Sequence, residues 1–221
     1  MNERRPVYRF LSFIMIVLLA VGCSSSDPAP PVYLDGYVSA DGDVAGARVQ
    51  VTDMSGNVRA QKASATSSSG AFTITVNGLP RPFRVVSSGG TIADRPADYR
   101  LTTQIERFNP GTDRVYVNLV TTLVCAYLDR NPGKSLADAI GEVKAFLAIP
   151  AEVDIAAGLY HSTKYFSALT FLQEAETNGG VEAFLGTLAQ QLTLDPAARH
   201  PFPSRLLGGP GGGALTACPG T

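Results

Sequence analysis

The sequence predicts an α+β protein in which an N-terminal β-sandwich is followed by a small helical domain of about four helices. Between residues 32 and 117, apolar and polar residues alternate in short runs separated by turn signals, as in strands that bury one face. From residue 118 onward, apolar residues recur every three or four positions, which is typical of amphipathic helices. The apolar content of 45% is that of an ordinary globular chain.

Two runs show the alternation most clearly. Successive side chains of a strand point to opposite faces, so alternation places every apolar side chain of a run on one buried face. Dipeptides that favour turns separate the runs. The predicted inward-facing side chains are Ala47, Val49, Val51, Phe72, Ile74 and Val76. The turn signals are Asp41-Gly42, Ser55-Gly56-Asn57, Ser69-Gly70 and Asn77-Gly78.

An extra β-hairpin is predicted after these strands. Alternation over residues 99–105 predicts one strand, residues 109–112 predict a turn, and residues 115–117 predict the returning strand. We expect this hairpin to extend or flank the sandwich. The side chains that share one face of its first strand are Tyr99, Leu101, Thr103 and Ile105.

Four helices follow, and their ends are marked by capping residues. Asn118 is placed to cap the first helix, and Ser135 with Asp138 resembles a capping box for the second. Gly179-Gly180 separates the third helix from the fourth. Each helix must bury its apolar stripe against other helices or against the sandwich. The predicted stripes are Leu119, Val120, Leu123, Val124 and Tyr127; Leu136, Ile140, Val143 and Leu147; Tyr165, Phe166, Leu169 and Leu172; and Val181, Phe184, Leu185, Leu188 and Leu192.

Glycine positions in the β segment fit a known domain type. Gly36 lies in the first strand, Gly46-Ala47 opens the second, and Ser69-Gly70-Ala71-Phe72 leads into a later strand. With Asp53 and Gly56, this pattern resembles the carboxypeptidase regulatory-like domain, over about residues 32–88. The resemblance implies a transthyretin-like, Ig-like sandwich and no activity, because such domains are attached to many different proteins.

The helical segment shows a second resemblance. Residues 117–155 contain Thr121-Thr122-Leu123, then a Ser-Leu-x-x-Ala helix, then an apolar-Pro-x-x-Val-Asp loop. This order is similar to the helical half of uncharacterised exported bacterial lipoproteins. That resemblance implies no activity.

The first 22 residues predict a lipoprotein signal peptide. Three arginines among residues 1–9 precede an apolar run at 10–21, which is too short to cross a bilayer as a helix. Ala20-Val21-Gly22-Cys23 resembles the lipobox of bacterial lipoproteins. The resemblance implies cleavage before Cys23 and attachment of several fatty chains there, which together hold a protein stably on a membrane. Ordinary secretion, with Cys23 as a structural thiol, is the alternative.

These segments give the predicted organisation of the chain. Residues 23–31 are rich in Ser and Pro and predict a flexible tether. Ser24, next to the lipid site, resembles lipoproteins sent to the outer membrane of Gram-negative bacteria, which is the location we expect. The full order is a signal peptide at 1–22, the tether at 23–31, the sandwich with its hairpin at 32–117, the helical domain at 118–205 and a Gly-rich tail at 206–221.

Cys125 and Cys218 are the two cysteines that remain if Cys23 is acylated. An exported chain lies in a compartment where disulfides persist. At 100° per residue, Cys125 falls outside the predicted apolar stripe of its helix, toward Thr121 and Asp129. We therefore expect an accessible Cys125 that forms a disulfide with Cys218 and fixes the tail. Two free or intermolecular thiols are the alternative.

No residue pattern in the sequence is typical of a catalytic, metal or cofactor site. His161 and His200 lack zinc-site spacing, and Ser162 is better placed to cap a helix than to act as a nucleophile. The Gly-rich segment 208–213 lacks the Lys-Ser/Thr of a phosphate-binding loop. Asp41, Asp43 and Asp53 could suggest calcium, but aspartates beside glycines are usual in turns. We therefore predict no metal, no cofactor and no catalytic residue.

Aromatic side chains of the helical domain allow two interpretations. They could line a binding groove, or they could form core. Phe171 lies off the predicted stripe of its helix, so we expect it to contact the sandwich or a partner. The aromatic residues concerned are Tyr160, Tyr165, Phe166 and Phe171.

The charge balance excludes one class of partner. With 18 basic and 19 acidic residues, the chain has no electrostatic footprint for nucleic acid. The sequence therefore predicts a non-enzymatic protein, lipid-anchored through Cys23 in the cell envelope, that binds a protein, a glycan or cell-wall material. The alternative is a structural or assembly accessory subunit of an envelope complex, and an enzyme of unrecognised type is the third choice.

Replacing Cys23 tests the predicted address. In Cys23→Ser the thiol that would carry the lipid is missing, so we expect the protein to leave the membrane pellet and to incorporate no labelled palmitate. Cell fractionation and metabolic labelling measure both effects. If the variant pellets with the membrane as the natural protein does, or if the natural protein takes up no label, the lipid anchor is wrong.

Overall fold

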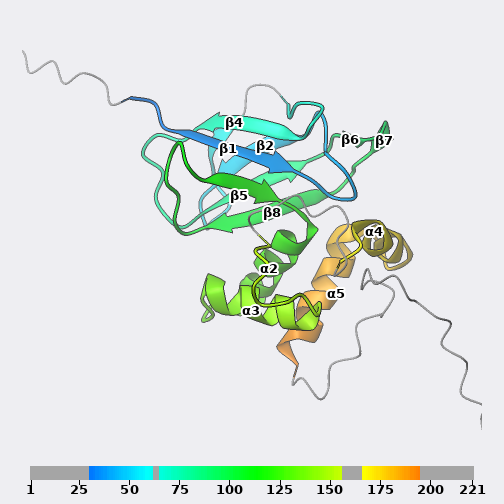
Figure 1. Cartoon of the computed structure of the whole chain (residues 1–221). Helices are drawn as coiled ribbons and strands as arrows, with labels where there is room; N and C mark the ends of the chain where they lie inside the picture. The colour runs from blue at the N-terminus through cyan, green and yellow to red at the C-terminus, as the bar shows by residue number, and fades with distance from the viewer. Residues whose placement is uncertain (1–29, 62–64, 156–165, 195–221) are drawn as a thin grey trace, which may run out of the picture. The chain divides into compact units, whose positions relative to one another are not determined.

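The computed structural model describes residues 30–61, 65–155 and 166–194 (Figure 1). Strands occupy the first part of these residues and helices the second, which confirms the predicted α+β class. The strands form sheets that do not close into a barrel. Among the residues described, no helix combines the length and the apolar character that a membrane span requires.

Two sheets and a small hairpin make up the β region. In the three-stranded sheet, β1 lies between β4 and β9, antiparallel to β4 and parallel to β9. The four-stranded sheet has the order β3-β2-β5-β8 and is antiparallel throughout. The strands are β1 (Tyr33–Val38), β2 (Arg48–Thr52), β3 (Val58–Gln61), β4 (Ala71–Thr75), β5 (Phe83–Ser88), β6 (Thr91–Ile92), β7 (Arg95–Pro96), β8 (Arg100–Ile105) and β9 (Arg114–Val117). The short strands β6 and β7 pair with each other.

The predicted alternation is confirmed, because all six side chains expected to face inward are buried. They meet inward side chains of β1, β5 and β9 in one continuous core. Gly36 explains why the first strand carries a glycine. A Cβ at this position would clash with the Val115 carbonyl oxygen and with the Phe72 ring, which lies against the backbone of β1. The glycine therefore makes room for the largest side chain of the neighbouring strand.

The predicted hairpin over residues 99–117 is wrong. Its two strands form as β8 and β9, but β8 pairs with β5 in one sheet and β9 pairs with β1 in the other. The segment around Asn109 does turn, with its side chain and backbone bonded to Asp113. That turn carries the chain across from one sheet to the other. Strands adjacent in sequence often pair, and this pair follows the less common path.

The helices are α2 (Leu119–Arg130), α3 (Leu136–Phe146), α4 (Ala168–Thr177) and α5 (Val181–Thr193). Both predicted caps are confirmed as capping boxes. Asn118 accepts from the backbone N–H of Thr121, and Ser135 accepts from that of Asp138. Gly180 precedes α5, as the Gly-Gly signal predicted. Ser162, the other expected cap, lies outside the described residues.

The helix stripes are partly confirmed. All predicted stripe residues of α2 and α5 are buried. In α3, Val143 is fully buried, while Leu136 and Ile140 keep part of their surface. The stripe predicted for the third helix is confirmed only at Phe166, which is buried just before α4 begins. Leu169 is 45% exposed, and the buried face of α4 is formed by Ala168, Phe171 and Ala175.

Helix α2 joins the two halves of the structure. It contacts β8 and β9 on one side and α3 and α5 on others, and Figure 1 shows it next to β8. Nine of its twelve residues are buried. Cys125 is one of them, only 3% exposed, so its predicted accessibility is wrong. The prediction assumed that one side of the helix faces solvent. In the structure, strands and other helices cover α2 on several sides.

A buried hydrogen-bond cluster, here called the threonine clamp, fixes α2 to β8. The clamp consists of Thr102, Asn118, Thr121 and Thr122. The N–H of Thr102 donates to the Thr122 hydroxyl at 2.9 Å, and the Thr121 hydroxyl donates to the Thr102 carbonyl at 3.0 Å. Asn118 Nδ2 donates to the Ile155 carbonyl at 3.3 Å. Because β8 is the last strand of its sheet, these hydroxyls take the place of a missing neighbouring strand.

Removing one hydroxyl tests the clamp. Thr122→Val keeps the side-chain shape but leaves the buried Thr102 N–H without a partner, so we expect the free energy of unfolding to fall by about 1–3 kcal/mol. Urea denaturation measures the change. Thr187→Val, at an exposed position of α5, is the matched control and should change little. Equal effects of the two variants would contradict the role of the clamp.

Candidate functional site

Several residues singled out in the sequence lie outside the described residues. Cys23 and Cys218 are among them, so the predicted lipidation and the predicted Cys125–Cys218 disulfide stay predictions. The other such residues are Tyr160, His161, Ser162, Tyr165, His200 and the Gly-rich segment 208–213.

Two of the three aspartates that could have suggested calcium are engaged in other contacts. Asp41 pairs with Arg95 at 2.8 Å. Asp53 pairs with Arg59 at 2.6 Å and accepts hydrogen bonds from Asn57. The side-chain hydrogen bond from Asn57 is the main cause that lowers the pKa of Asp53 to about 2. In the part of the chain that the structure describes, no group of acidic, His or Cys side chains could hold a metal ion.

Cys125 is a free, buried thiol among the described residues. Burial raises its pKa to about 12, and the nearby Arg84 guanidinium offsets this only in part. A thiol with this pKa carries almost no thiolate at neutral pH, and the thiolate is the reactive form. Cys125 therefore serves as a small apolar core residue.

Phe171 is a core residue, only 1% exposed, so the predicted contact with a partner is wrong, while a contact with the sandwich stays a prediction. Its ring lies 5.7 Å from that of Phe166 and 5.0 Å from that of Phe184 on α5, measured between centroids. All three rings are buried. The aromatic cluster joins α4 to α5, so these phenylalanines do not line a groove.

The outer face of the three-stranded sheet carries a set of side chains that the sequence reasoning missed. We call it the tyrosine face. Its residues come from three strands, and each alternates with a buried neighbour. In the register of the sheet, Tyr37 lies opposite Tyr116, and Asp35 lies between Thr73 and Arg114. The tyrosine face consists of Tyr33, Asp35, Tyr37, Thr73, Arg114 and Tyr116.

Contacts within the tyrosine face hold its side chains in place. The rings of Tyr37 and Tyr116 are nearly parallel, with 17° between their planes and 5.8 Å between centroids. Arg114 donates to the Tyr37 hydroxyl at 2.8 Å and lies 5.7 Å from that ring's centroid. Thr73 donates to the Asp35 carboxylate at 2.6 Å. Tyr33 is 49% exposed, and Tyr37 and Tyr116 are half-buried, so each ring keeps part of its surface exposed.

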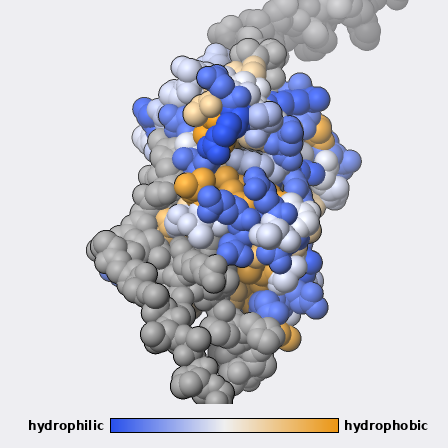
Figure 2. All heavy atoms as spheres, turned by 90° about the vertical axis from the view of Figure 1, so that its right-hand side faces the viewer, coloured by the Kyte–Doolittle hydropathy of each residue, from blue (hydrophilic) through white to orange (hydrophobic). Residues whose placement is uncertain are grey.

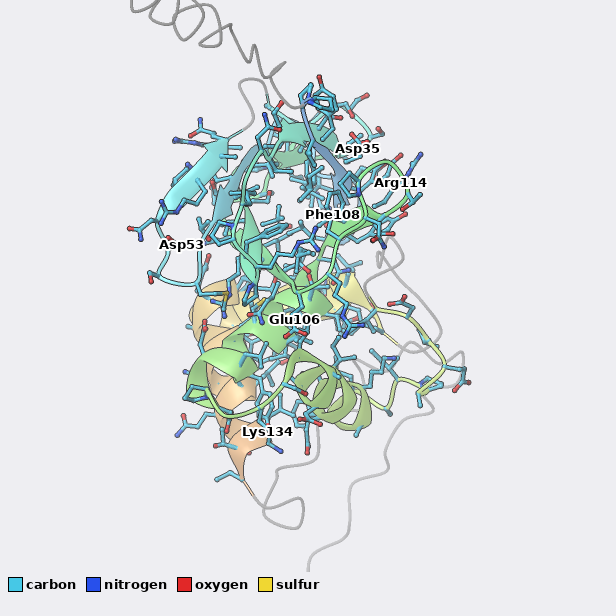
Figure 3. All side chains as sticks on the ribbon, turned by 90° about the vertical axis from the view of Figure 1, so that its left-hand side faces the viewer. Asp35, Asp53, Glu106, Phe108, Arg114 and Lys134 are labelled. Carbon is cyan, nitrogen blue, oxygen red and sulfur yellow. The ribbon has the colours of Figure 1, made fainter. Side chains whose placement is uncertain are left out.

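A groove of about 710 Å³ continues from the tyrosine face, because Arg114 and Tyr116 belong to both. Its other walls come from residues 103–108 and from the start of α3. Figure 3 shows Asp35 and Arg114 on this side of the molecule, with Phe108 and Glu106 following toward the helices. The volume is within the range of small-molecule sites.

The groove has an apolar floor and a charged rim. Phe108 and Val115 are buried at its base, and Leu136 and Ile140 contribute part of their surface. The rim carries both signs of charge, and this combination suits a ligand with an apolar surface and many hydrogen-bonding groups. The charged residues are Glu106, Arg107, Asp113, Arg114 and Asp154.

Thiol labelling tests the character of Cys125. In the native protein we expect iodoacetamide to leave Cys125 unmodified, because the group is buried and its thiolate is scarce. Peptide mapping by mass spectrometry measures the modification at each cysteine. Fast modification of native Cys125 would contradict its burial. Labelling after unfolding, with and without reductant, shows separately whether Cys125 is paired with Cys218.

Comparison with protein-family models, with curated proteins and with solved structures gave no match for this chain. The resemblances to the carboxypeptidase regulatory-like domain, to exported lipoproteins and to the lipobox therefore stay predictions from the sequence. The tyrosine face and the groove beside it are the candidate site that the described residues offer.

Proposed function

We propose that this protein is a lipid-anchored, non-enzymatic binding module of the bacterial cell envelope, and that its tyrosine face binds a glycan. The observation that carries the proposal is the near-parallel pair Tyr37 and Tyr116, fixed beside the charged side chains of Asp35 and Arg114. The predicted signal peptide and Cys23 supply the address, since glycans and cell-wall polymers are major components of that compartment.

The chemistry of a sugar matches this face. A pyranose ring presents a face of C–H groups, which packs on an aromatic ring, and an edge of hydroxyl groups, which need hydrogen-bond partners. Asp35 and Thr73 offer oxygen acceptors, and Arg114 offers several donors in a fixed plane. A tyrosine ring held by its neighbours loses little conformational entropy on binding, which favours affinity.

The shape of the surface supports a chain rather than a single sugar. The tyrosine face is an open sheet surface, and the groove extends from it past β9 toward α3. A polymer lying across Tyr37 and Tyr116 would place its next unit at the groove rim. The alternative, an accessory subunit of an envelope complex, would use the same face for protein contact and predicts a co-purifying partner in place of glycan retention.

Truncating the two tyrosines tests the proposal. We expect the mature protein to be retained on peptidoglycan or on an envelope polysaccharide, and Tyr37→Ala or Tyr116→Ala to weaken retention about tenfold or more, because an anchoring aromatic ring is lost. Affinity electrophoresis against immobilised glycan measures retention. Circular dichroism confirms that each variant is folded.

Met54→Ala is the control, since Met54 is 44% exposed and lies outside the tyrosine face. It should bind as the natural protein does. No retention of the natural protein on any glycan tested, or equal retention of the tyrosine variants, would overturn the proposal. A stable protein complex recovered from membranes and lost in the tyrosine variants would favour the accessory role.

A further inference from the structure

A second hollow lies elsewhere on the molecule and is not used by the proposed function. This cleft has a volume of about 410 Å³ and lies between the β6–β7 hairpin and helix α4. It also receives Asp41 from the loop after β1 and Glu182 from the start of α5. We call it the acidic cleft.

Four carboxylates and one guanidinium line the acidic cleft. Arg95 pairs with Asp41, whose side chain is only 7% exposed, and Glu182 accepts from the Arg100 backbone N–H at 2.8 Å. Asp98 and Glu176 are exposed and make no hydrogen bond with the residues that the structure describes, although Glu176 interacts electrostatically with Arg95. The cleft therefore keeps an excess of negative charge after its internal pairs are counted.

The hydroxyl of Tyr99 is the unusual feature of the acidic cleft. Its oxygen is buried and has no hydrogen-bond partner within the described residues, although Tyr99 lines the cleft. Burial raises the pKa of this phenol above its usual value, so it stays neutral at physiological pH. Buried polar groups without partners are uncommon, and a ligand that donates a hydrogen bond would satisfy this one.

Apolar side chains form the other part of the lining of the acidic cleft. Two of them are Leu169 and Leu172, which the sequence assigned to the core stripe of α4. Leu169 is 45% exposed, and Leu172 is half-buried. Ile92, Pro96 and Val181 also line it. Figure 2, which views the side that carries β6, β7 and α4, shows apolar residues gathered between hydrophilic ones on this face. Apolar walls beside acidic groups suit a ligand with an aliphatic stem and a cationic end.

We propose that the acidic cleft binds a primary ammonium group carried on an aliphatic chain, as in a lysine side chain. The stem packs between the leucines of α4 and the hairpin. The ammonium group has three donors, which match the oxygens of Tyr99, Asp98 and Glu176. The single guanidinium of the cleft, on Arg95, pairs with Asp41 and also interacts electrostatically with Glu176, so the four carboxylates are only partly neutralised.

Titration calorimetry on the full mature chain in detergent tests this proposal with three probes at neutral pH. They are Nα-acetyl-lysine methylamide, the norleucine analogue with the same stem and no ammonium, and 1,5-diaminopentane. We expect the lysine probe to bind at least about tenfold more tightly than the norleucine probe, because the charge-assisted hydrogen bonds are lost in the latter. Tighter binding of the lysine amide than of the diamine indicates a peptide as the source, and the reverse indicates a free amine.

Two variants and a control locate the site. Tyr99→Phe and Glu176→Gln should each weaken the lysine probe about tenfold. Tyr99→Phe should not lower the melting temperature, since it removes a buried hydroxyl that has no partner. Glu152→Gln, an exposed acid away from the cleft, should leave binding unchanged.

The proposal is overturned if the lysine and norleucine probes bind equally, if neither amine binds, or if both cleft variants bind like the natural protein. None of these results bears on the tyrosine face, because Tyr37 and Tyr116 do not line the acidic cleft. Loss of glycan retention in the tyrosine variants likewise leaves this proposal standing.

Discussion

The structure depends on how one exposed sheet edge is closed. Strand β8 ends its sheet, and an unpaired edge leaves backbone N–H and C=O groups that would pair with another chain. The threonine clamp binds these groups with the hydroxyls of Thr121 and Thr122 and so makes α2 part of the sandwich. The groove and the acidic cleft both lie where helices meet strands. A short side-chain cluster thus positions surfaces contributed by residues far apart in sequence.

Local pattern predicted the elements well and their partners less well. Alternation found β2 and β4 because each buries one face against the other sheet, and side-chain chemistry found the caps at Asn118 and Ser135. The hairpin prediction failed because tertiary packing decides whether β9 pairs with β8 or with β1. The prediction that Cys125 is accessible failed for a related reason. A helical wheel shows which side is most apolar, and it cannot show that a strand will cover the opposite side.

The candidate site was hidden for the same physical reason. Tyr37 and Tyr116 occupy outward positions of their strands, where a lone tyrosine is unremarkable. They come together only because β1 and β9 are parallel neighbours, and a parallel pair joins segments distant along the chain. In α4, Phe171 fills the space against α5, so Leu169 and Leu172 lie on another side of the helix, where they line the acidic cleft. The spacing of apolar residues along the helix selects the leucines, because spacing alone does not show that Phe171 competes with them for the same buried space.

The place of β1 in its sheet has a mechanical consequence. β1 is the central strand, hydrogen-bonded to β4 on one side and β9 on the other, and it begins directly after the predicted tether. A load between a membrane attachment and the helices would pull β1 from its first residue and β9 from its last. In parallel neighbours that geometry loads every hydrogen bond of the pair at once, in shear, instead of opening them one by one. β1 is thereby the strand best placed to withstand tension applied at its first residue.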